Sequence, residues 1–352
     1  MRNAAITGWG MYVPEQILTN AELEQMVETS DEWIVSRTGI RERRLAAPAD
    51  TTLAMSARAS RQAIEVAGID PSEIDLIVLA TVTPDKFMPS TASLLQTELG
   101  AHRAAAFDLA AACSGFVYAL AVGSQFIQTG VHKTVLVVGT DALTRFIDFT
   151  DRGTCILFGD GSGAVVLHAS DVEEGVLSNV LGSDGRGAQH LYIDGFDSNG
   201  LYGRTISSNG NGTGNAAVDE LQRTYMKMNG NEVYRFSVRV MGETAIEAVN
   251  RAGLRLGDID WLIPHQANLR IIDAAAKRLD LPRDRVWVNL DRYGNTSAAS
   301  VPICLAEAAE SGKIQPGMNL VLVAFGAGLS WASSVVRWGA TGVRGKGTER
   351  DG

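Results

Sequence analysis

Apolar residues along the chain follow two patterns: short continuous runs, and longer segments in which they recur at helical spacing. The run at 104–109 predicts a buried strand, because a strand covered on both faces carries apolar residues at consecutive positions. Directly after it, Phe116, Leu120 and Ile127 recur at the spacing of one helix face and predict a helix over 114–129. Gly130 follows at the position where a helix typically stops.

The chain contains a diverged internal repeat. Residues 67–78, AGIDPSEIDLIV, match residues 252–263, AGLRLGDIDWLI, without a gap. Each half then predicts the order helix, strand, loop, strand, helix, strand, Gly-rich turn and strand. This order predicts α/β layers in which a central helix packs between sheets. The unit is far longer than a solenoid repeat, so we interpret it as a duplicated domain.

The repeat and the composition divide the chain into four parts. The Gly-, Asn- and Ser-rich stretch between the halves predicts a connecting segment, and the polar, Gly-rich C-terminal stretch predicts a disordered tail. The predicted parts are an N-terminal half (1–175), a connecting segment (176–230), a C-terminal half (231–340) and the tail (341–352).

Composition narrows the class of protein. With 352 residues, 45% hydrophobic and 20% charged, the chain is expected to be a soluble globular protein with a large core. A net charge of −9 argues against a nucleic-acid partner, and no apolar run is long enough to span a membrane. Three widely spaced cysteines predict neither a disulfide framework nor a metal site, and Cys155 and Cys304 are expected in the core. We expect a cytoplasmic protein without a signal peptide.

Cys113 is the first candidate for chemistry, because it lies at the predicted strand-to-helix turn. The partial positive charge of a helix N-terminus favours a thiolate and is expected to lower the cysteine pKa. The neighbours at 110–112 and 114–115 are small and would let a substrate carbonyl approach the sulfur. A buried structural cysteine is an equally good interpretation of this segment alone.

Two polar residues of the second half make a catalytic interpretation stronger. His265 follows the apolar run 261–264, and Asn295 follows the apolar run 286–290 and a Tyr-Gly turn. Each alone is more typical of a core histidine or a helix cap. A cysteine, a histidine and an asparagine, each after a predicted strand, together indicate covalent chemistry in a cleft between the two halves.

Several motifs carry a resemblance to a known family. They are DEWIVSRTGIRER at 31–43, AAACSG at 110–115, TDRG at 150–153, FGDG at 158–161, PHQANLR at 264–270, GNTS at 294–297 and AFGAG at 324–328. From about residue 6 to residue 338 the chain resembles β-ketoacyl-acyl-carrier-protein synthase III, the initiating condensing enzyme of bacterial fatty-acid synthesis. The resemblance implies a thiolase-like fold whose duplicated halves form α-β-α-β-α layers.

The resemblance also implies a reaction: decarboxylative condensation of an acyl-CoA with malonyl-acyl carrier protein, without a cofactor beyond these substrate carriers. Cys113 would carry the acyl group, and neutral His265 and Asn295 would donate hydrogen bonds to the enolate. The backbone N–H groups of Cys113 and of the Gly326–Ala327 region would bind the tetrahedral oxyanion. Alanine stands at 327 where the family usually has glycine, which matters little if its backbone dihedrals suit alanine.

Carrier-binding positions follow from the same resemblance. Trp33 and Arg152 would sandwich the adenine of coenzyme A, and Arg37 would meet phosphate or ribose. Asn268 would meet the pantetheine amides, and Arg270 would dock the acidic carrier protein. Without the motif matches, these residues would be interpreted as solvated helix faces.

The starter acyl group is expected to depend on two features. Met88 stands where the family places an acyl-pocket residue that reaches across a homodimer interface. The segment 185–226 is longer than is usual in the family. A flexible methionine fills or vacates space more readily than an aromatic ring, so the starter stays open.

Two other function classes stay open. One is a thiolase-fold acyltransferase or condensing enzyme of polyketide or other secondary metabolism; in an acyltransferase, His265 would act as a general base. The other is a non-catalytic scaffold. The intact Asn295 disfavours the acyltransferase, and the complete set of three residues disfavours the scaffold.

Overall fold

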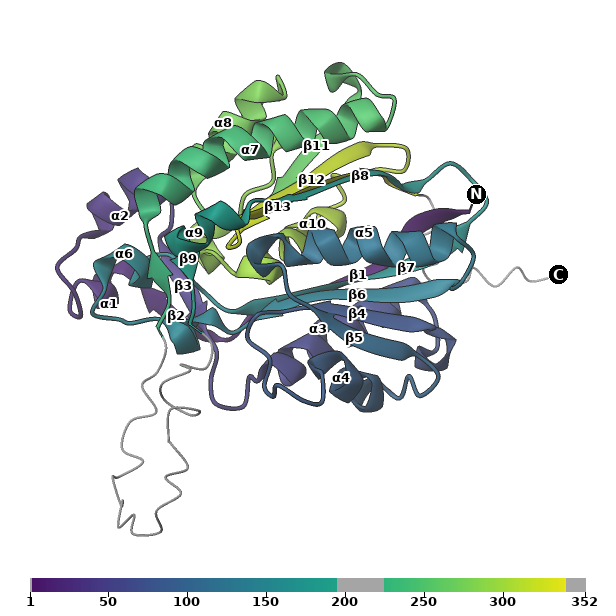
Figure 1. Ribbon diagram of the computed structural model, residues 1–352, viewed down its shortest axis with the longest axis horizontal. Coiled ribbons are helices and arrows are strands. Elements are labelled where there is room, and N and C mark those ends of the chain that lie inside the picture. Colours follow the sequence, from purple (N-terminus) through teal and green to yellow (C-terminus); the bar gives the residue numbers. More distant parts are fainter. Residues whose placement is uncertain (1, 195–224, 340–352) are drawn as a thin grey trace, which may run out of the picture.

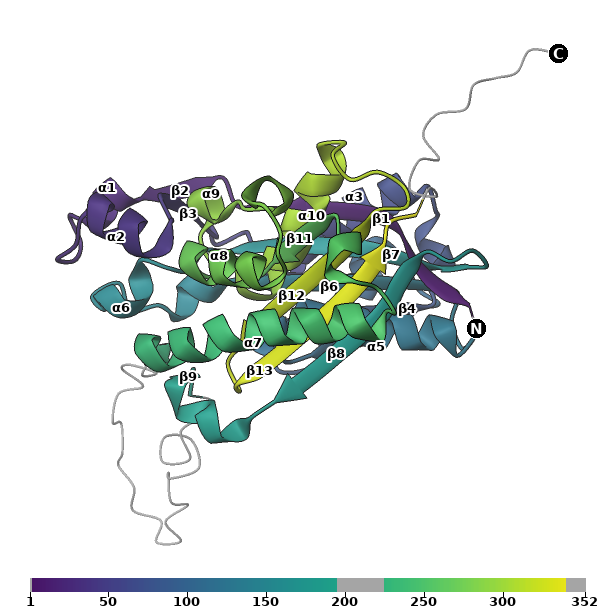
Figure 2. The ribbon, with the colours of Figure 1, turned by 90° about the horizontal axis from the view of Figure 1, so that it is seen from above.

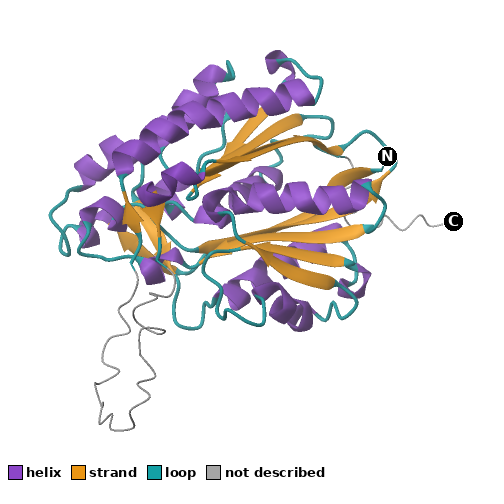
Figure 3. Ribbon diagram, in the orientation of Figure 1, coloured by secondary structure: helices purple, strands orange, loops and turns teal. Residues whose placement is uncertain are grey.

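The computed structural model describes residues 2–194 and 225–339. Two β-sheets enclose a layer of helices, and further helices cover the outer face of each sheet (Figures 1 and 3). The predicted α-β-α-β-α order is therefore confirmed. The tail 341–352 and residues 195–224 of the long segment 185–226 lie outside the described residues.

The first sheet has five strands in the order β1-β7-β6-β4-β5. β4 is parallel to both β5 and β6, whereas β7 is antiparallel to β1 and β6. Alternate residues of β4 face opposite layers: Leu76 and Val78 pack toward the central helix, and Ile77 and Leu79 toward the outer helices. The strands are β1 (Asn3–Tyr12), β4 (Leu76–Ala80), β5 (Ala105–Leu109), β6 (Thr134–Asp141) and β7 (Gly161–Ser170), and the outer helices are α3 (Thr52–Ala67) and α4 (Thr91–Leu99).

Two details of the first half differ from the sequence expectation. The connection expected to be a loop between β4 and β5 contains helix α4. The strand predicted at 104–109 is not fully buried, because β5 lies at the edge of the sheet and its residues are exposed or half-buried. The helix predicted over 114–129 is confirmed as α5 (Gly115–Gln128), which ends before Gly130.

The second sheet has four strands in the order β11-β12-β13-β8. β11 is parallel to β12, and β13 is antiparallel to β12 and β8. The strands are β8 (Gly175–Ser183), β11 (Trp261–Pro264), β12 (Asn319–Gly326) and β13 (Ser330–Arg337), with α7 (Gly230–Arg251) and α8 (Leu269–Arg278) on the outer face.

The two sheets correspond strand for strand except at one edge. β8, β13, β12 and β11 take the places of β1, β7, β6 and β4. The segment 176–230, predicted to be a connector, therefore begins with a strand of the second sheet. The strand expected at 286–290 is wrong: only one parallel bridge joins Val286 to Leu262, and helix α9 (Leu290–Tyr293) follows.

Between the sheets lie α5 and α10 (Ser300–Glu310), each preceded by a 3₁₀ turn, η2 (Ala112–Ser114) and η7 (Ser297–Ala299). Glycine permits the close approach of these layers. A Cβ atom at Gly139 of β6 would lie 2.4 Å from the carbonyl oxygen of Ala298. The first sheet therefore touches the turn that precedes the central helix of the second half.

The smaller elements gather at one end of the molecule (Figure 2). Arg43 is fully buried there and donates to Leu18 O (3.0 Å), Asn20 Oδ1 (2.9 Å) and Ile156 O (2.8 Å). Burial lowers its pKa to about 10. Arg43 thus ties three segments together. The smaller elements at this end of the molecule are β2 (Gln16–Thr19), α1 (Asn20–Leu23), α2 (Asp31–Thr38), β3 (Glu42–Leu45), α6 (Arg152–Cys155), β9 (Leu191–Tyr192) and β10 (Lys227–Met228).

Cys155 and Cys304 are buried, as expected. Among the described residues, no helix combines the length and apolar character needed to cross a bilayer. The same residues contain no group of three or more His, Cys, Asp or Glu side chains that could hold a metal ion.

Candidate active site

Cys113 lies in the short turn η2, directly before α5, so its predicted place between a strand and a helix is confirmed. Ala112 has a positive φ of 47°, which turns the chain sharply at this point. The Ser114 hydroxyl donates to Ala111 O (2.7 Å) and lies 2.8 Å from the Ser330 hydroxyl at the start of β13. These contacts fix the turn that carries Cys113 against the second sheet.

Cys113 is buried, with 7% of the residue exposed. Burial raises its pKa to about 12; the Ser297 hydroxyl lowers that pKa, and the Asp141 carboxylate raises it further. The expectation of a lowered pKa is therefore wrong, because desolvation of the thiolate outweighs the helix N-terminus. The Cys113 thiol of the free protein is therefore neutral at neutral pH.

The turn between β12 and β13 lies against Cys113. A Cβ atom at Gly326 would come within 2.7 Å of the Cys113 backbone nitrogen and 3.2 Å of the Ser114 nitrogen. The expected oxyanion segments, at Cys113 and at Gly326–Ala327, are therefore side by side. Ala327 is not among the described residues with a positive φ, so alanine is tolerated at this position.

His265 follows β11 and is 1% exposed. Its backbone N–H donates to Val323 O (2.8 Å), and its ring meets the Phe325 ring edge-on, with centroids 5.3 Å apart. Nδ1 lies 2.6 Å from Ser300 Oγ, whereas Nε2 is buried without a partner among the described residues. Burial lowers the pKa of His265 to about 3, so the imidazole is neutral.

Asn295 is 5% exposed and is held by backbone bonds on both sides. Its N–H donates to Leu157 O (2.8 Å), and its carbonyl accepts from Gly159 N–H (3.0 Å). The Gly-rich motif at 158–161 thus lies beside the site, and its Phe158 forms a parallel bridge with Asn295. The side-chain Oδ1 accepts from Ser297 N–H (2.9 Å), which leaves the Nδ2 amide as the free donor.

Sequence reasoning missed three residues of the site: Asp141, Ser297 and Ser300. Asp141, at the end of β6, accepts from Ala298 N–H (3.2 Å) and so fixes the turn η7. A charged residue shortly after the apolar run 135–138 was a readable signal. Ser297 and Ser300 gave no such signal, because serine is common at the start of helices.

The expected coenzyme A residues come together from α2, α6 and α8. The guanidinium carbons of Arg37 and Arg152 lie 4.7 and 5.1 Å from the Trp33 ring centroid. Asn268 Nδ2 donates to Arg37 O (3.0 Å), and the Arg270 guanidinium donates to Ser36 O (2.7 Å). A base stacked between two planes needs a gap of roughly 7 Å, so Arg152 must move away from Trp33 before adenine can enter.

Met88 lies apart from this group of residues, in the loop after β4. It is 84% exposed, and its neighbour Phe87 is 81% exposed. Met88 is therefore not packed into a pocket of its own chain, and a role in the acyl pocket requires a second subunit.

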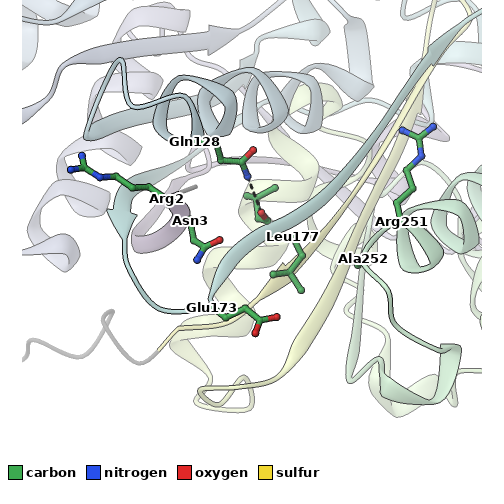
Figure 4. Close-up of a pocket in the computed structure, with 8 residues that line it drawn as sticks. Arg2, Asn3, Gln128, Glu173, Leu177, Arg251 and Ala252 are labelled. Atoms are coloured by element: carbon green, nitrogen blue, oxygen red, sulfur yellow. Dashed lines mark hydrogen bonds between the residues drawn. The ribbon is translucent and has the colours of Figure 1, made fainter.

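A cavity of about 310 Å³ lies beside Gln128, at the C-terminal end of α5 (Figure 4). Arg2, Gln128, Glu173 and Arg251 line it, and Gln128 Nε2 donates to Val176 O (3.3 Å). Gln128 is the last residue of α5, whereas Cys113 precedes its first. This cavity is therefore separate from the candidate active site.

A buried cysteine before a central helix, with His and Asn donors from the other α/β half, defines the thiolase-fold class of condensing enzymes. Comparison with known proteins identifies the family within that class. Residues 107–185 match the model of 3-oxoacyl-[acyl-carrier-protein] synthase III, and residues 249–338 match that of its C-terminal part. The chain is 52% identical to the β-ketoacyl-[acyl-carrier-protein] synthase III of Roseiflexus castenholzii over 96% of its length and 98% of the relative's.

Solved structures agree with this assignment. The synthase III of Aquifex aeolicus matches with a TM-score of 0.86 and 41% identity, over 95% of this chain and 100% of that one. The priming β-ketosynthase of the R1128 polyketide pathway matches with a TM-score of 0.87 and 38% identity, over 96% and 97% of the two chains. The protein belongs to the β-ketoacyl-acyl-carrier-protein synthase III family.

The contact between Gly326 and Cys113 generates a prediction. Gly326→Ala should slow acylation of Cys113 at least about tenfold and lower the free energy of unfolding by about 1–3 kcal/mol, because the new methyl group forces the two backbones apart. Ala327→Gly is the matched control and should acylate at the parent rate. Acylation is followed by mass spectrometry and stability by denaturant unfolding; parent-like acylation by Gly326→Ala would contradict this view of the turn.

Proposed function

We propose that this protein initiates fatty-acid synthesis by condensing an acyl-CoA starter with malonyl-acyl carrier protein. The products are 3-oxoacyl-acyl carrier protein, CO₂ and coenzyme A. The observation that carries the proposal concerns two donors in the half of the fold that packs against Cys113. Among the described residues, the Asn295 Nδ2 amide is free to donate and the buried His265 Nε2 has no partner. The names of the relatives support the same reaction.

In the first step, the Cys113 sulfur attacks the thioester carbonyl of acyl-CoA. The new carbon–sulfur bond replaces the bond to coenzyme A, and the proton of the thiol finally resides on the coenzyme A thiol. The N–H groups of Cys113 and of the Gly326–Ala327 region stabilise the oxyanion that forms in between. The Ser297 hydroxyl, which lowers the Cys113 pKa, favours the charge that develops on sulfur.

In the second step, the malonyl thioester loses CO₂, and the electrons of the broken bond form an enolate. His265 and Asn295 donate to the enolate oxygen. Both groups are neutral, so they stabilise the negative charge without protonating the carbanion. The enolate carbon then attacks the acyl carbonyl on Cys113, and the cysteine leaves as thiolate and regains a proton from solvent.

The carriers bind at the end of the molecule that contains α2, α6 and α8. Trp33, Arg152 and Arg37 supply an aromatic face and two guanidinium groups for the adenine and phosphates of coenzyme A. Asn268 meets the pantetheine amides. Arg270, exposed on α8 in a protein of net charge −9, docks the acidic carrier protein.

A second pathway is compatible with the same chemistry. The similarity to the priming ketosynthase of the R1128 polyketide pathway favours it as the alternative setting. A panel of acyl-CoA donors with malonyl carrier protein, with products identified by mass spectrometry, separates a short-chain primer of fatty acids from a polyketide primer. Absence of any 3-oxoacyl product, with acyl transfer to an alcohol or amine instead, would favour the acyltransferase alternative.

We further propose that the protein is a cytoplasmic homodimer. β5 is the last strand of the first sheet, and such an edge offers N–H and C=O groups to another strand. The exposed Phe87 and Met88 lie in a loop of the same half. A second copy that covers this edge and loop would bury both apolar side chains and could place Met88 in the partner's acyl pocket.

The first prediction of this proposal concerns the nucleophile. Incubation with acyl-CoA alone should add one acyl mass to the peptide that contains Cys113. Cys113→Ala should take up no acyl group, whereas Cys155→Ala, which removes another buried thiol, should be labelled like the parent. Equal labelling of the Cys113→Ala protein would show that the nucleophile lies elsewhere.

A second prediction separates the two chemical steps. His265→Ala and Asn295→Ala should still be acylated, but decarboxylation of the malonyl carrier should fall roughly 100-fold or more, since each removes a donor that acts on developing charge. Release of labelled CO₂ measures the second step and the acyl mass the first. Normal decarboxylation by both variants is the outcome that excludes these roles.

A third prediction concerns assembly. Static light scattering at micromolar concentration should give the mass of a dimer, and Met88→Asp should shift the equilibrium toward monomer by placing a charge in an apolar interface. Val131→Asp introduces the same charge at another exposed apolar residue, 63% exposed, and should leave the dimer intact. A monomeric parent protein is incompatible with the proposed pocket.

A fourth prediction concerns the starter. Met88→Phe should reduce kcat/KM for isobutyryl- and octanoyl-CoA more than for acetyl-CoA, because a rigid ring takes up space at the acyl tail. The change should be graded, since one methylene in an apolar pocket contributes about 1–3 kcal/mol. Malonyl decarboxylation should be unchanged and serves as the control. An unaltered ratio of long to short donors would remove Met88 from the pocket.

A further inference from the structure

The two ring nitrogens of His265 lie in different surroundings. Nδ1 is 2.6 Å from the hydroxyl oxygen of Ser300, the first residue of α10. Nε2 is buried and has no hydrogen-bond partner among the described residues. Since the imidazole is neutral, one nitrogen carries the proton and the other offers a lone pair. Which one carries it decides whether His265 can donate to a substrate.

The hydroxyl of Ser300 has a second contact that limits its role. The backbone N–H of Gln266 donates to the same oxygen at 3.2 Å. An N–H group cannot accept a hydrogen bond, so this contact uses a lone pair of the Ser300 oxygen. The Ser300 O–H proton therefore still needs an acceptor. Among the described residues, His265 Nδ1 is the acceptor that the structure offers to that proton.

Counting unpaired groups distinguishes the two tautomers. If the proton were on Nδ1, that nitrogen would donate to Ser300, and both the Ser300 O–H and the Nε2 lone pair would be buried without a partner. If the proton is on Nε2, Ser300 donates to Nδ1, and only the Nε2–H is left without a partner among the described residues. A buried polar group without a partner destabilises the fold, so the second arrangement, which leaves fewer such groups, is favoured.

We infer that Ser300 is a positioning residue that holds His265 in the tautomer with its proton on Nε2. This inference rests on the proposed function and deepens it, because an Nε2–H is the donor that the enolate oxygen requires. It also explains why His265 is unsuited to act as a general base at Nε2, the role that the acyltransferase alternative needs. The edge-on Phe325 ring and the backbone bond to Val323 fix the plane of the ring.

The direct test is the tautomer of the intact, full-length enzyme. In protein labelled with ¹⁵N-histidine, long-range ¹H–¹⁵N correlation spectra distinguish a protonated Nε2 from a protonated Nδ1. The chain has five histidines, and the His265 signals are assigned by their loss in His265→Ala. A protonated Nε2 supports the inference; a protonated Nδ1 overturns it, whatever the activity of the enzyme.

The kinetic test uses Ser300→Ala. Cys113 should still be acylated at the parent rate, while malonyl decarboxylation should fall at least about 10-fold and at most about 1000-fold, the cost of losing such a donor outright. The His265 signals should also show both tautomers. Ser300→Thr, which keeps the hydroxyl, should restore the tautomer and most of the rate. An unchanged rate, or a parallel loss of acylation, would overturn the positioning role.

Ser333→Ala is the matched control. Ser333 is fully buried on β13, and its hydroxyl donates to Leu322 O (3.0 Å), so the variant also loses one buried serine hydrogen bond. It should leave both chemical steps unchanged. Failure of the proposed function is distinguishable from failure of the inference: a parent enzyme that releases no CO₂ from malonyl carrier refutes the function, while the spectrum still reports the tautomer.

Discussion

The site depends on one buried carboxylate that joins the two halves of the fold. Asp141 is fully buried at the end of β6 and accepts hydrogen bonds from Thr81 Oγ1, Val82 N–H and Thr83 Oγ1 of the first half, and from Ala298 N–H of the second. An ionised carboxylate in the interior costs several kcal/mol unless donors surround it, and here four of them do. Burial still raises its pKa. The bond to Ala298 N–H fixes the turn beside Asn295, so the geometry of the proposed enolate donors depends on this carboxyl group.

Burial also decides the charge state of the catalytic groups. It raises the pKa of Cys113 to about 12 and lowers that of His265 to about 3, so both groups are neutral in the free enzyme. A thiolate–imidazolium pair would add a cationic acid beside a carbanion intermediate, and a proton transfer there would end the reaction. A neutral N–H donor stabilises the enolate without that risk. In the proposed mechanism, burial therefore lowers the nucleophilicity of Cys113 in the acylation step and protects the carbanion in the condensation step.

Local patterns predicted local structure. Helical spacing after a short apolar run was sufficient to predict α5 and the turn that carries Cys113, and the repeat was sufficient for the layered fold. The apolar run at 286–290 had the same appearance as a strand, but Trp287 and Asn289 donate to Glu307 of α10, and the fifth strand of the second sheet is absent from the described residues. The bond from Ala298 to Asp141 joins residues 157 positions apart, and the Cys113 pKa depends on two packed sheets. Neither is encoded in a local window.

The duplication places two equivalent turns in the fold, one with the proposed nucleophile Cys113 and the other beside Asn295. η2 and η7 both begin with a residue in the left-handed region, Ala112 (φ 47°) and Ser297 (φ 52°), and both lead into a central helix, so Cys113 corresponds to Ala298. β6 and β12, equivalent in topology, end at Asp141 and Gly326. Each end contacts the turn of the opposite half: Asp141 accepts the N–H of Ala298, whereas glycine at 326 presents no side chain to the N–H of Cys113. The backbone N–H of Ala298 thus donates to a carboxylate in one half. The equivalent N–H of Cys113 meets no side chain at 326 in the other half, and there it is proposed to bind the oxyanion. A single exchange of aspartate for glycine at a symmetric position therefore distinguishes the half proposed to carry the acyl group from the half proposed to hold the enolate donors.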